Sequence, residues 1–174
     1  MTSGDVLSGR RVRRIAHRTS VAAVSVAVAL CTGLAGAGEH TDLTVVRISP
    51  PEVRVFDIET LEAMEQVVFT TSTPWTDVPH RYSGIPLARL IGPAPPRTGT
   101  VRLVALNDYA VEIPVADVED ALPIVAHSRD GERMSIRDKG PYWVMYPFDE
   151  GPDYRSERHF SRSVWQLVRI EVHP

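Results

Sequence analysis

The sequence contains almost no cysteine. Cys31 is the one cysteine among 174 residues, and it lies in an N-terminal apolar run. The rest of the chain therefore has no disulfide, no thiolate nucleophile and no thiolate metal ligand. The histidines that follow residue 37 form no H-x-H, H-x-x-x-H or H-E-x-x-H motif. A metal pair built from neighbouring histidines is thereby excluded.

The motifs of several common enzyme classes are also absent. There is no G-x-S-x-G segment, no P-loop and no G-x-G-x-x-G segment, so no nucleophile elbow or phosphate-binding glycine loop is indicated. Asp149 and Glu150 stand in a loop with glycine and proline, and we interpret them as solvated carboxylates rather than catalytic ones. Local motifs alone identify no enzyme.

Positive charge is scarce outside the N-terminus. Five of the 19 basic residues and one of the 22 acidic residues lie in residues 1–37, which leaves 14 basic against 21 acidic residues, a net charge of −7. Such an acidic chain is repelled by phosphate backbones and by anionic lipid headgroups. We expect no nucleic-acid partner.

The N-terminus has the three parts of a secretory signal peptide. Residues 10–18 hold five arginines, residues 21–34 form an apolar run, and Ala35-Gly36-Ala37 is a small-residue cleavage site. The apolar run is shorter than the roughly 20 residues that span a bilayer. We therefore predict a signal peptide over 1–37, an N-terminal lead over 38–50 and one domain over 51–174. The chain is then exported to the periplasm or the cell exterior, and an uncleaved signal that anchors it to the membrane is the alternative.

The remaining chain alternates short apolar runs with turn residues. Asp57 is a candidate N-cap of a short helix, and a second short helix is expected within 84–92. Asn107-Asp108 and Asp130-Gly131 are typical of hairpin turns. The fold class predicted is α+β, a β-rich mixed domain with short peripheral helices. Strands are expected at 53–56, 66–71, 101–106, 109–113, 123–127, 133–136, 142–147 and 164–172, and a long charged loop at 148–161.

Several segments, taken in order, resemble the molybdopterin-binding oxidoreductase domain of the sulfite oxidase family. They are DIETLEAM, VVFTTSTPWTD, YSGIPLARLIG, VRLVALNDYAVEIP, PIVAHSRDGERMSIRDKGPYWVMYP and SVWQLVRIEV, which span about residues 51–174. The chain is most similar to the short, exported, single-domain members. The resemblance implies the sulfite oxidase type of fold, an oxidoreductase activity and molybdopterin as cofactor.

The chain departs from the family pattern at three positions. Catalytic members carry a molybdenum-ligating cysteine in the loop after the first helix and strand, and that loop here is Thr70–Trp75, without cysteine. A hydroxyl is a far poorer ligand for this metal than a thiolate. Trp143 stands near the place of a family arginine, and Val164 stands where a lysine often precedes the tryptophan. Both losses remove cations that bind anionic groups.

These departures predict a fold kept without its molybdenum centre. We expect the vacated cleft to bind a small molecule, although packing of the threonines and aromatic residues in strands and core is a simpler alternative. The residues expected to line the cleft are Thr71, Ser72, Thr73, Trp75, Asn107, Asp108, Tyr109, Tyr142 and Trp143.

Three functions are compatible with this sequence. The first is an exported binding or sensory module without cofactor, which acts with a membrane sensor; a redox partner is expected only for the second. The second is a molybdopterin-dependent oxidoreductase that holds its cofactor without a cysteine ligand. The third is a non-redox enzyme or a structural protein of the cell envelope.

Overall fold

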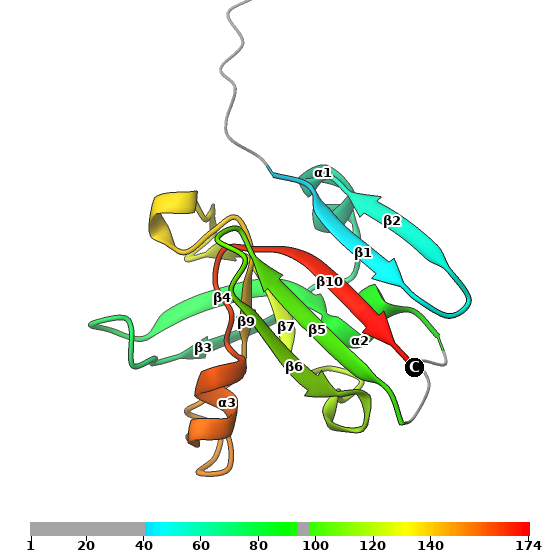
Figure 1. Cartoon of the computed structure of the whole chain (residues 1–174). Helices are drawn as coiled ribbons and strands as arrows, with labels where there is room; N and C mark the ends of the chain where they lie inside the picture. The colour runs from blue at the N-terminus through cyan, green and yellow to red at the C-terminus, as the bar shows by residue number, and fades with distance from the viewer. Residues whose placement is uncertain (1–40, 94–97) are drawn as a thin grey trace, which may run out of the picture. The chain divides into compact units, whose positions relative to one another are not determined.

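The computed structural model describes residues 41–93 and 98–174. The signal peptide expected at 1–37 lies outside the described residues. Within them, no helix is both long enough and apolar enough to cross a membrane. The described chain forms two five-stranded sheets with short helices at their margins, which confirms the α+β class (Figure 1).

The first sheet joins the two ends of the described chain. Its strand order is β2 (Glu52–Phe56), β1 (Leu43–Arg47), β10 (Leu167–His173), β5 (Thr100–Ala105) and β6 (Ala110–Pro114). β1 runs parallel to β10, and the other neighbours are antiparallel. β1 lies in the stretch expected as an N-terminal lead, and its pairing with β10 makes it an inner strand of the sheet (Figure 1).

The second sheet has the order β3 (Val67–Thr71), β4 (His80–Pro86), β7 (Ile124–Arg129) and β8 (Glu132–Arg133), and β9 (Trp143–Met145) also pairs with β7. Gly84 lies where β4 crosses close to β7. A Cβ atom at this position would meet the Val125 carbonyl oxygen at 2.2 Å, so only glycine allows the two backbones to approach this closely.

The two helices expected from the sequence, α1 and α2, begin and end as predicted. Asp57 caps α1 (Ile58–Ala63) by accepting a hydrogen bond from the Thr60 amide at 2.7 Å. α2 (Leu87–Ile91) follows Pro86 and ends at Gly92, whose φ is 79°. The guanidinium groups of Arg47 and Arg54 donate to the last carbonyls of α2, where the helix dipole favours cations.

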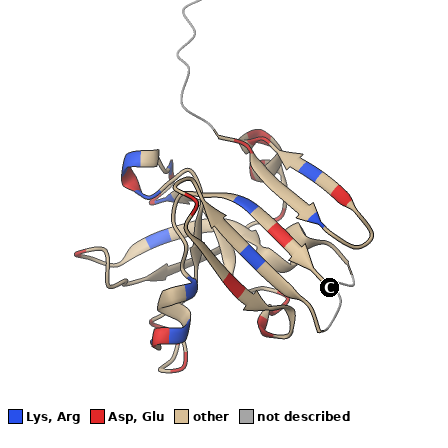
Figure 2. Ribbon diagram, viewed as in Figure 1, with Lys and Arg blue, Asp and Glu red and all other residues tan. Residues whose placement is uncertain are grey.

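The hydrophobic core contains residues of both sheets. Its largest side chains with less than 2% exposure include Trp143, Tyr82, Tyr142 and Phe148. Opposite charges pair across the strands of the first sheet, as Arg102 and Glu171 do at 3.0 Å. Figure 2 shows acidic and basic residues interspersed on these strands. The core therefore joins the two sheets. On the exposed face of the first sheet, basic and acidic side chains neutralise one another in neighbouring pairs.

Four sequence predictions need correction in the second half of the chain. Residues 148–161 are not only a loop, because they contain most of α3 (Glu157–Arg162), with Ser156 at its N-cap. The last strand begins at Leu167 rather than at residue 164. Gln166 has a φ of 51°, and this left-handed conformation is incompatible with a strand. Of the strand expected at 133–136, only Arg133 lies in β8, and Ile136 begins a short 3-10 helix, Ile136–Asp138. The strand expected at 142–147 is shortened to β9.

Candidate functional site: an aromatic pocket

Trp75 lies at the centre of an aromatic cluster. Its ring centroid is 5.9 Å from that of Trp143, 6.3 Å from Phe148, 6.0 Å from Phe160 and 5.7 Å from Trp165. The rings of Phe160 and Trp165 meet Trp75 edge to face, at 87° and 70°. Edge-to-face contacts of this kind add to the stabilisation from burial. The cluster therefore joins the loop after β3 to β9, α3 and the segment between α3 and β10.

A cavity of about 470 Å³, which we call the aromatic pocket, opens beside this cluster. Its volume suits a small organic molecule. Four aromatic side chains share its wall with amide, hydroxyl, carboxylate and aliphatic groups. The lining residues are Trp75, Ala105, Asn107, Tyr109, Glu157, Phe160, Ser161, Ser163, Val164 and Trp165.

Three parts of the chain supply the walls. The β5–β6 turn contributes Asn107 and Tyr109, and its shape depends on Asp108, whose φ is 64°. The Asn107 side chain accepts a hydrogen bond from the Tyr109 amide at 3.2 Å. This local bond holds the turn that carries the Tyr109 ring. α3 contributes its first and middle residues, and Val164 and Trp165 follow it.

Tyr109 differs from the other rings of the pocket. It is 55% exposed, and within residues 41–93 and 98–174 its ring contacts no other aromatic side chain. Trp165 is 40% exposed although it packs against Trp75. Large rings exposed on a concave surface are typical of binding sites, because burial against a ligand releases their hydration water.

The hydroxyl groups of residues 71–73 do not line this pocket. Thr71 is fully buried, and its hydroxyl accepts from the Asp149 amide at 3.1 Å. The Ser72 amide and hydroxyl donate to the Asp149 carboxylate at 2.6 and 2.7 Å. The two hydrogen bonds from Ser72 lower the pKa of the Asp149 carboxyl, and the one from the backbone amide has the larger effect. Residues 71–73, here called the hydroxyl turn, thus fasten the end of β3 to the loop after β9.

Thr73 explains why a tryptophan follows this run of hydroxyl residues. Its hydroxyl accepts from the Trp75 amide at 3.1 Å and shares a hydrogen bond with the Thr76 hydroxyl at 2.9 Å. A threonine that caps the amide two residues ahead forms a tight local turn. The turn fixes the backbone of Trp75, so that its ring reaches both the core and the pocket.

The remaining predicted residues lie in different surroundings. Trp143 is 0% exposed and stands behind the pocket, where its indole Nε1 donates to the Ser163 carbonyl at 3.2 Å. Tyr142 is also buried, and burial raises its pKa to about 12. Asp108 is exposed at the tip of the β5–β6 turn and does not line the pocket. Of the nine residues predicted, the pocket contains Trp75, Asn107 and Tyr109.

Most of the other lining residues belong to α3 and the segment after it, which we expected as loop and strand. Glu157, Phe160 and Ser161 were not identified from the sequence, because residues 148–161 were expected to form a loop. One signal was available, because Ser156 followed by Glu157 is typical of a helix N-terminus. No pattern in the sequence shows that this helix lies beside the β5–β6 turn.

The histidines that the structure describes lie apart from one another. His80 contacts Asp130 at 2.6 Å, His127 contacts Gln66 at 2.8 Å and His159 contacts Ser156 at 2.9 Å. Among residues 41–93 and 98–174, no three metal-ligating side chains are grouped to hold an ion. His40 is outside the described residues.

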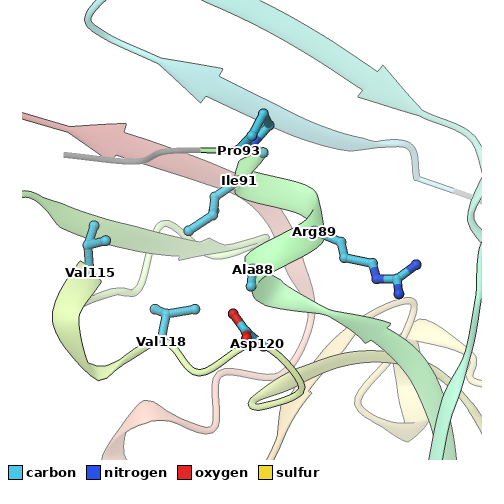
Figure 3. Close-up of a pocket in the computed structure, with 8 residues that line it drawn as sticks. Ala88, Arg89, Ile91, Pro93, Val115, Val118 and Asp120 are labelled. Carbon is cyan, nitrogen blue, oxygen red and sulfur yellow. The ribbon is translucent and has the colours of Figure 1, made fainter. Parts of the chain in front are cut away.

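A second cavity of about 640 Å³ lies between α2 and the segment after β6. Figure 3 shows Ala88, Val115 and Val118 around it, with the Arg89 side chain directed away from the valines. Arg89 pairs with Glu65 instead, at 2.5 Å. The cavity contains the carboxylate of Asp120 but no aromatic ring and none of the residues predicted from the sequence. We therefore place the candidate site in the aromatic pocket.

The charge of the pocket comes from one side chain. Glu157 is its sole charged lining residue, and it forms no ion pair with any residue of the described chain. Arg162, a cation of the same helix, binds Asp117 at 2.8 Å instead. The ammonium of Lys139 lies 5.1 Å from the Trp165 ring centroid and 5.7 Å from that of Trp143, and it is not part of the lining.

The comparison with known proteins supports the fold. No protein-family model matches the chain, and no curated protein sequence matches it. Among solved structures, it is similar to the sulfane dehydrogenase SoxCD from Paracoccus pantotrophus, with a TM-score of 0.56 and 16% identity. The match covers 76% of this chain and 38% of that one. This distant likeness supports, at the level of the fold, the resemblance drawn from the sequence.

Proposed function

We propose that this domain is an exported module that binds a small organic ligand in the aromatic pocket, without a molybdenum centre. The observation that carries the proposal is the pair of exposed rings, Tyr109 and Trp165, on the wall of a cavity of about 470 Å³. In a sensory role, the ligand-bound domain is recognised by a membrane sensor protein.

The residues beside the pocket do not fit molybdopterin. The loop after β3 offers hydroxyl groups in place of a thiolate, and those of Thr71 and Ser72 are already bonded to Asp149. The pocket lining contains no lysine or arginine to bind a phosphate, and its one charge is the carboxylate of Glu157. A soft metal prefers thiolate ligands, and a phosphate prefers guanidinium groups.

The second candidate is a molybdopterin-dependent oxidoreductase that holds its cofactor through the pterin alone. The fold likeness to a sulfane dehydrogenase favours it. A redox partner is expected in that case.

Metal and pterin analysis separates the two candidates. The full-length chain is exported from a host that makes molybdenum cofactor, and the purified protein is analysed for molybdenum, tungsten and oxidised pterin. We expect neither metal nor pterin. Near-stoichiometric molybdenum with pterin would support the oxidoreductase and overturn the proposal of a cofactor-free module.

Ligand binding is tested separately on the same protein. A panel of small fragments of positive, negative and zero charge is screened by ligand-observed nuclear magnetic resonance. The proposal expects binders that are lost in Tyr109→Ala and kept in Leu106→Ala. Leu106 is a matched control, since it is 46% exposed in the same turn but does not line the pocket. If no fragment depends on Tyr109, the pocket is not a binding site.

A further inference from the structure

We infer that the ligand of the aromatic pocket carries a positive charge, as an organic ammonium group does. The inference builds on the proposed function, because it specifies the chemistry of the ligand that the pocket receives. Three features carry it: the aromatic wall, the unpaired carboxylate of Glu157, and the ammonium group of Lys139, which already lies over Trp165, a ring of that wall.

Four aromatic rings line the pocket, and no lysine or arginine side chain lies among its lining residues. The rings of Trp75, Tyr109, Phe160 and Trp165 all line the pocket. A cation within about 6 Å of a ring centroid is attracted by the ring quadrupole, most strongly by tryptophan. An anion over the same faces is repelled. Four rings around one cavity therefore favour a cationic group over an anionic one.

The carboxylate of Glu157 also favours a cationic ligand over an anionic one. It is exposed at the first turn of α3 and makes no ion pair within the described residues. Other acidic residues near the cluster are occupied: Asp149 binds Ser72, and Asp117 binds Arg162. Glu157 is thus the one lining group with a free charge, and an ammonium ligand would neutralise it.

Lys139 shows that these tryptophans accept an ammonium group. Its Nζ atom lies over Trp165 and Trp143, at 5.1 and 5.7 Å from their centroids. Because Lys139 is not among the lining residues, it leaves the pocket itself free for a second cation. Its charge opposes such a ligand at longer range, and Glu157 offsets that repulsion.

The test uses three probes of nearly the same shape. Choline is the cation, 3,3-dimethylbutan-1-ol is its neutral carbon analogue, and 3,3-dimethylbutanoate is the anion. The sequence contains three tryptophans, Trp75, Trp143 and Trp165, and all three belong to the cluster. Tryptophan fluorescence of the full-length protein therefore reports directly on the pocket. We expect choline to bind with a dissociation constant on the order of 1 mM, and the other two probes to bind at least about fivefold more weakly.

Two charge variants give opposite expected shifts. Glu157→Gln removes the attracting carboxylate and should weaken choline binding about threefold, whereas Glu150→Gln, a control in the preceding loop outside the pocket lining, should leave it unchanged. Lys139→Gln removes the repelling ammonium and should strengthen choline binding about twofold. Neither Glu157→Gln nor Lys139→Gln should change the binding of the neutral alcohol.

The outcomes are separable from those of the proposed function. If the alcohol or the carboxylate binds as tightly as choline, or if no probe binds while fragments do bind in a Tyr109-dependent manner, the pocket is a binding site and the inference of a cationic ligand is wrong. If fragments do not bind either, the proposed function itself is lost. Choline selectivity with the two opposite charge effects supports the inference.

Discussion

The hydroxyl turn and the aromatic pocket meet at Trp75 but differ in which of their side-chain groups remain available to a ligand. The turn uses its hydroxyl groups internally, on Asp149 and on the Trp75 amide. The pocket leaves rings exposed, with Tyr109 at 55% and Trp165 at 40%. A small hydroxyl can be satisfied by one or two neighbours, whereas a large ring can pack on one side and remain open on the other. The hydroxyl turn therefore has a structural role, whereas the exposed rings of the pocket are available for binding.

The largest effect should come from the buried side of the cluster. Trp143→Ala should lower the free energy of unfolding by about 3–5 kcal/mol, because it empties a fully buried site and removes the bond to Ser163. Trp165→Ala, at a ring that is partly exposed, should cost only about 1 kcal/mol. Urea unfolding followed by circular dichroism measures both. Equal losses would mean that the two rings do not differ as packing and pocket residues.

The hydroxyl turn should respond next. Thr71→Val keeps the shape of the side chain but removes the acceptor of the Asp149 amide. We expect a loss of about 1–2 kcal/mol in unfolding free energy. Thr70→Val, on the exposed face of the same strand, should be close to neutral and serves as the control. The same urea titration compares them, and a neutral Thr71→Val would show that the turn is not fastened by this bond.

Acidification should weaken the turn through Asp149. Hydrogen bonds from Ser72 lower the pKa of this carboxyl in the folded state, so its stabilising effect is present above the ordinary aspartate pKa of about 3.9 and is lost as the pH falls through the lower folded value. Asp149→Asn should therefore cost about 1 kcal/mol at pH 7 and progressively less below pH 4 or so. Unfolding curves across this range measure the difference between the two proteins. If the difference in unfolding free energy between the two proteins does not become smaller at low pH, the lowered pKa is wrongly assigned to Asp149.

The smallest effect on stability should come from Tyr109. Its ring contacts no other aromatic side chain in the described residues, so Tyr109→Ala should change the unfolding free energy by less than about 0.5 kcal/mol. The same variant should lose the fragments and the choline binding that the pocket supports, and Tyr109→Phe should keep them. A large loss of stability in Tyr109→Ala would place this ring with the core rather than with the site.

The elements that depend on short-range signals could be predicted from sequence. The Asp57 cap, the hairpin around Asn107-Asp108 and the Asp130-Gly131 turn all appear where their residues indicate, because caps and turns are decided by neighbouring residues. α3 was missed, since Phe160 is the one apolar residue among its six and no apolar face can be recognised from it.

The candidate site was predictable only in part, for a different reason. Trp75, Asn107 and Tyr109 were identified and do line one pocket. Glu157 and Phe160 lie about fifty residues along the chain from Asn107 and Tyr109 and more than eighty from Trp75, and no local pattern indicates such a contact. The hydroxyl turn was expected in the cleft, but its bonds to Asp149 depend on a loop more than seventy residues away.

The sequence by itself determined the α+β class, the turns and caps, and the loss of every thiolate from the body of the chain, because these depend on composition and on neighbours along the backbone. Only the tertiary structure decided which side chains share a surface. Hydrogen bonds to Asp149 hold the hydroxyl turn away from the pocket, and the packing of α3 against β6 places Glu157 beside the aromatic rings. Such contacts arise when distant segments bury their apolar faces together, and burial is a property of the whole fold.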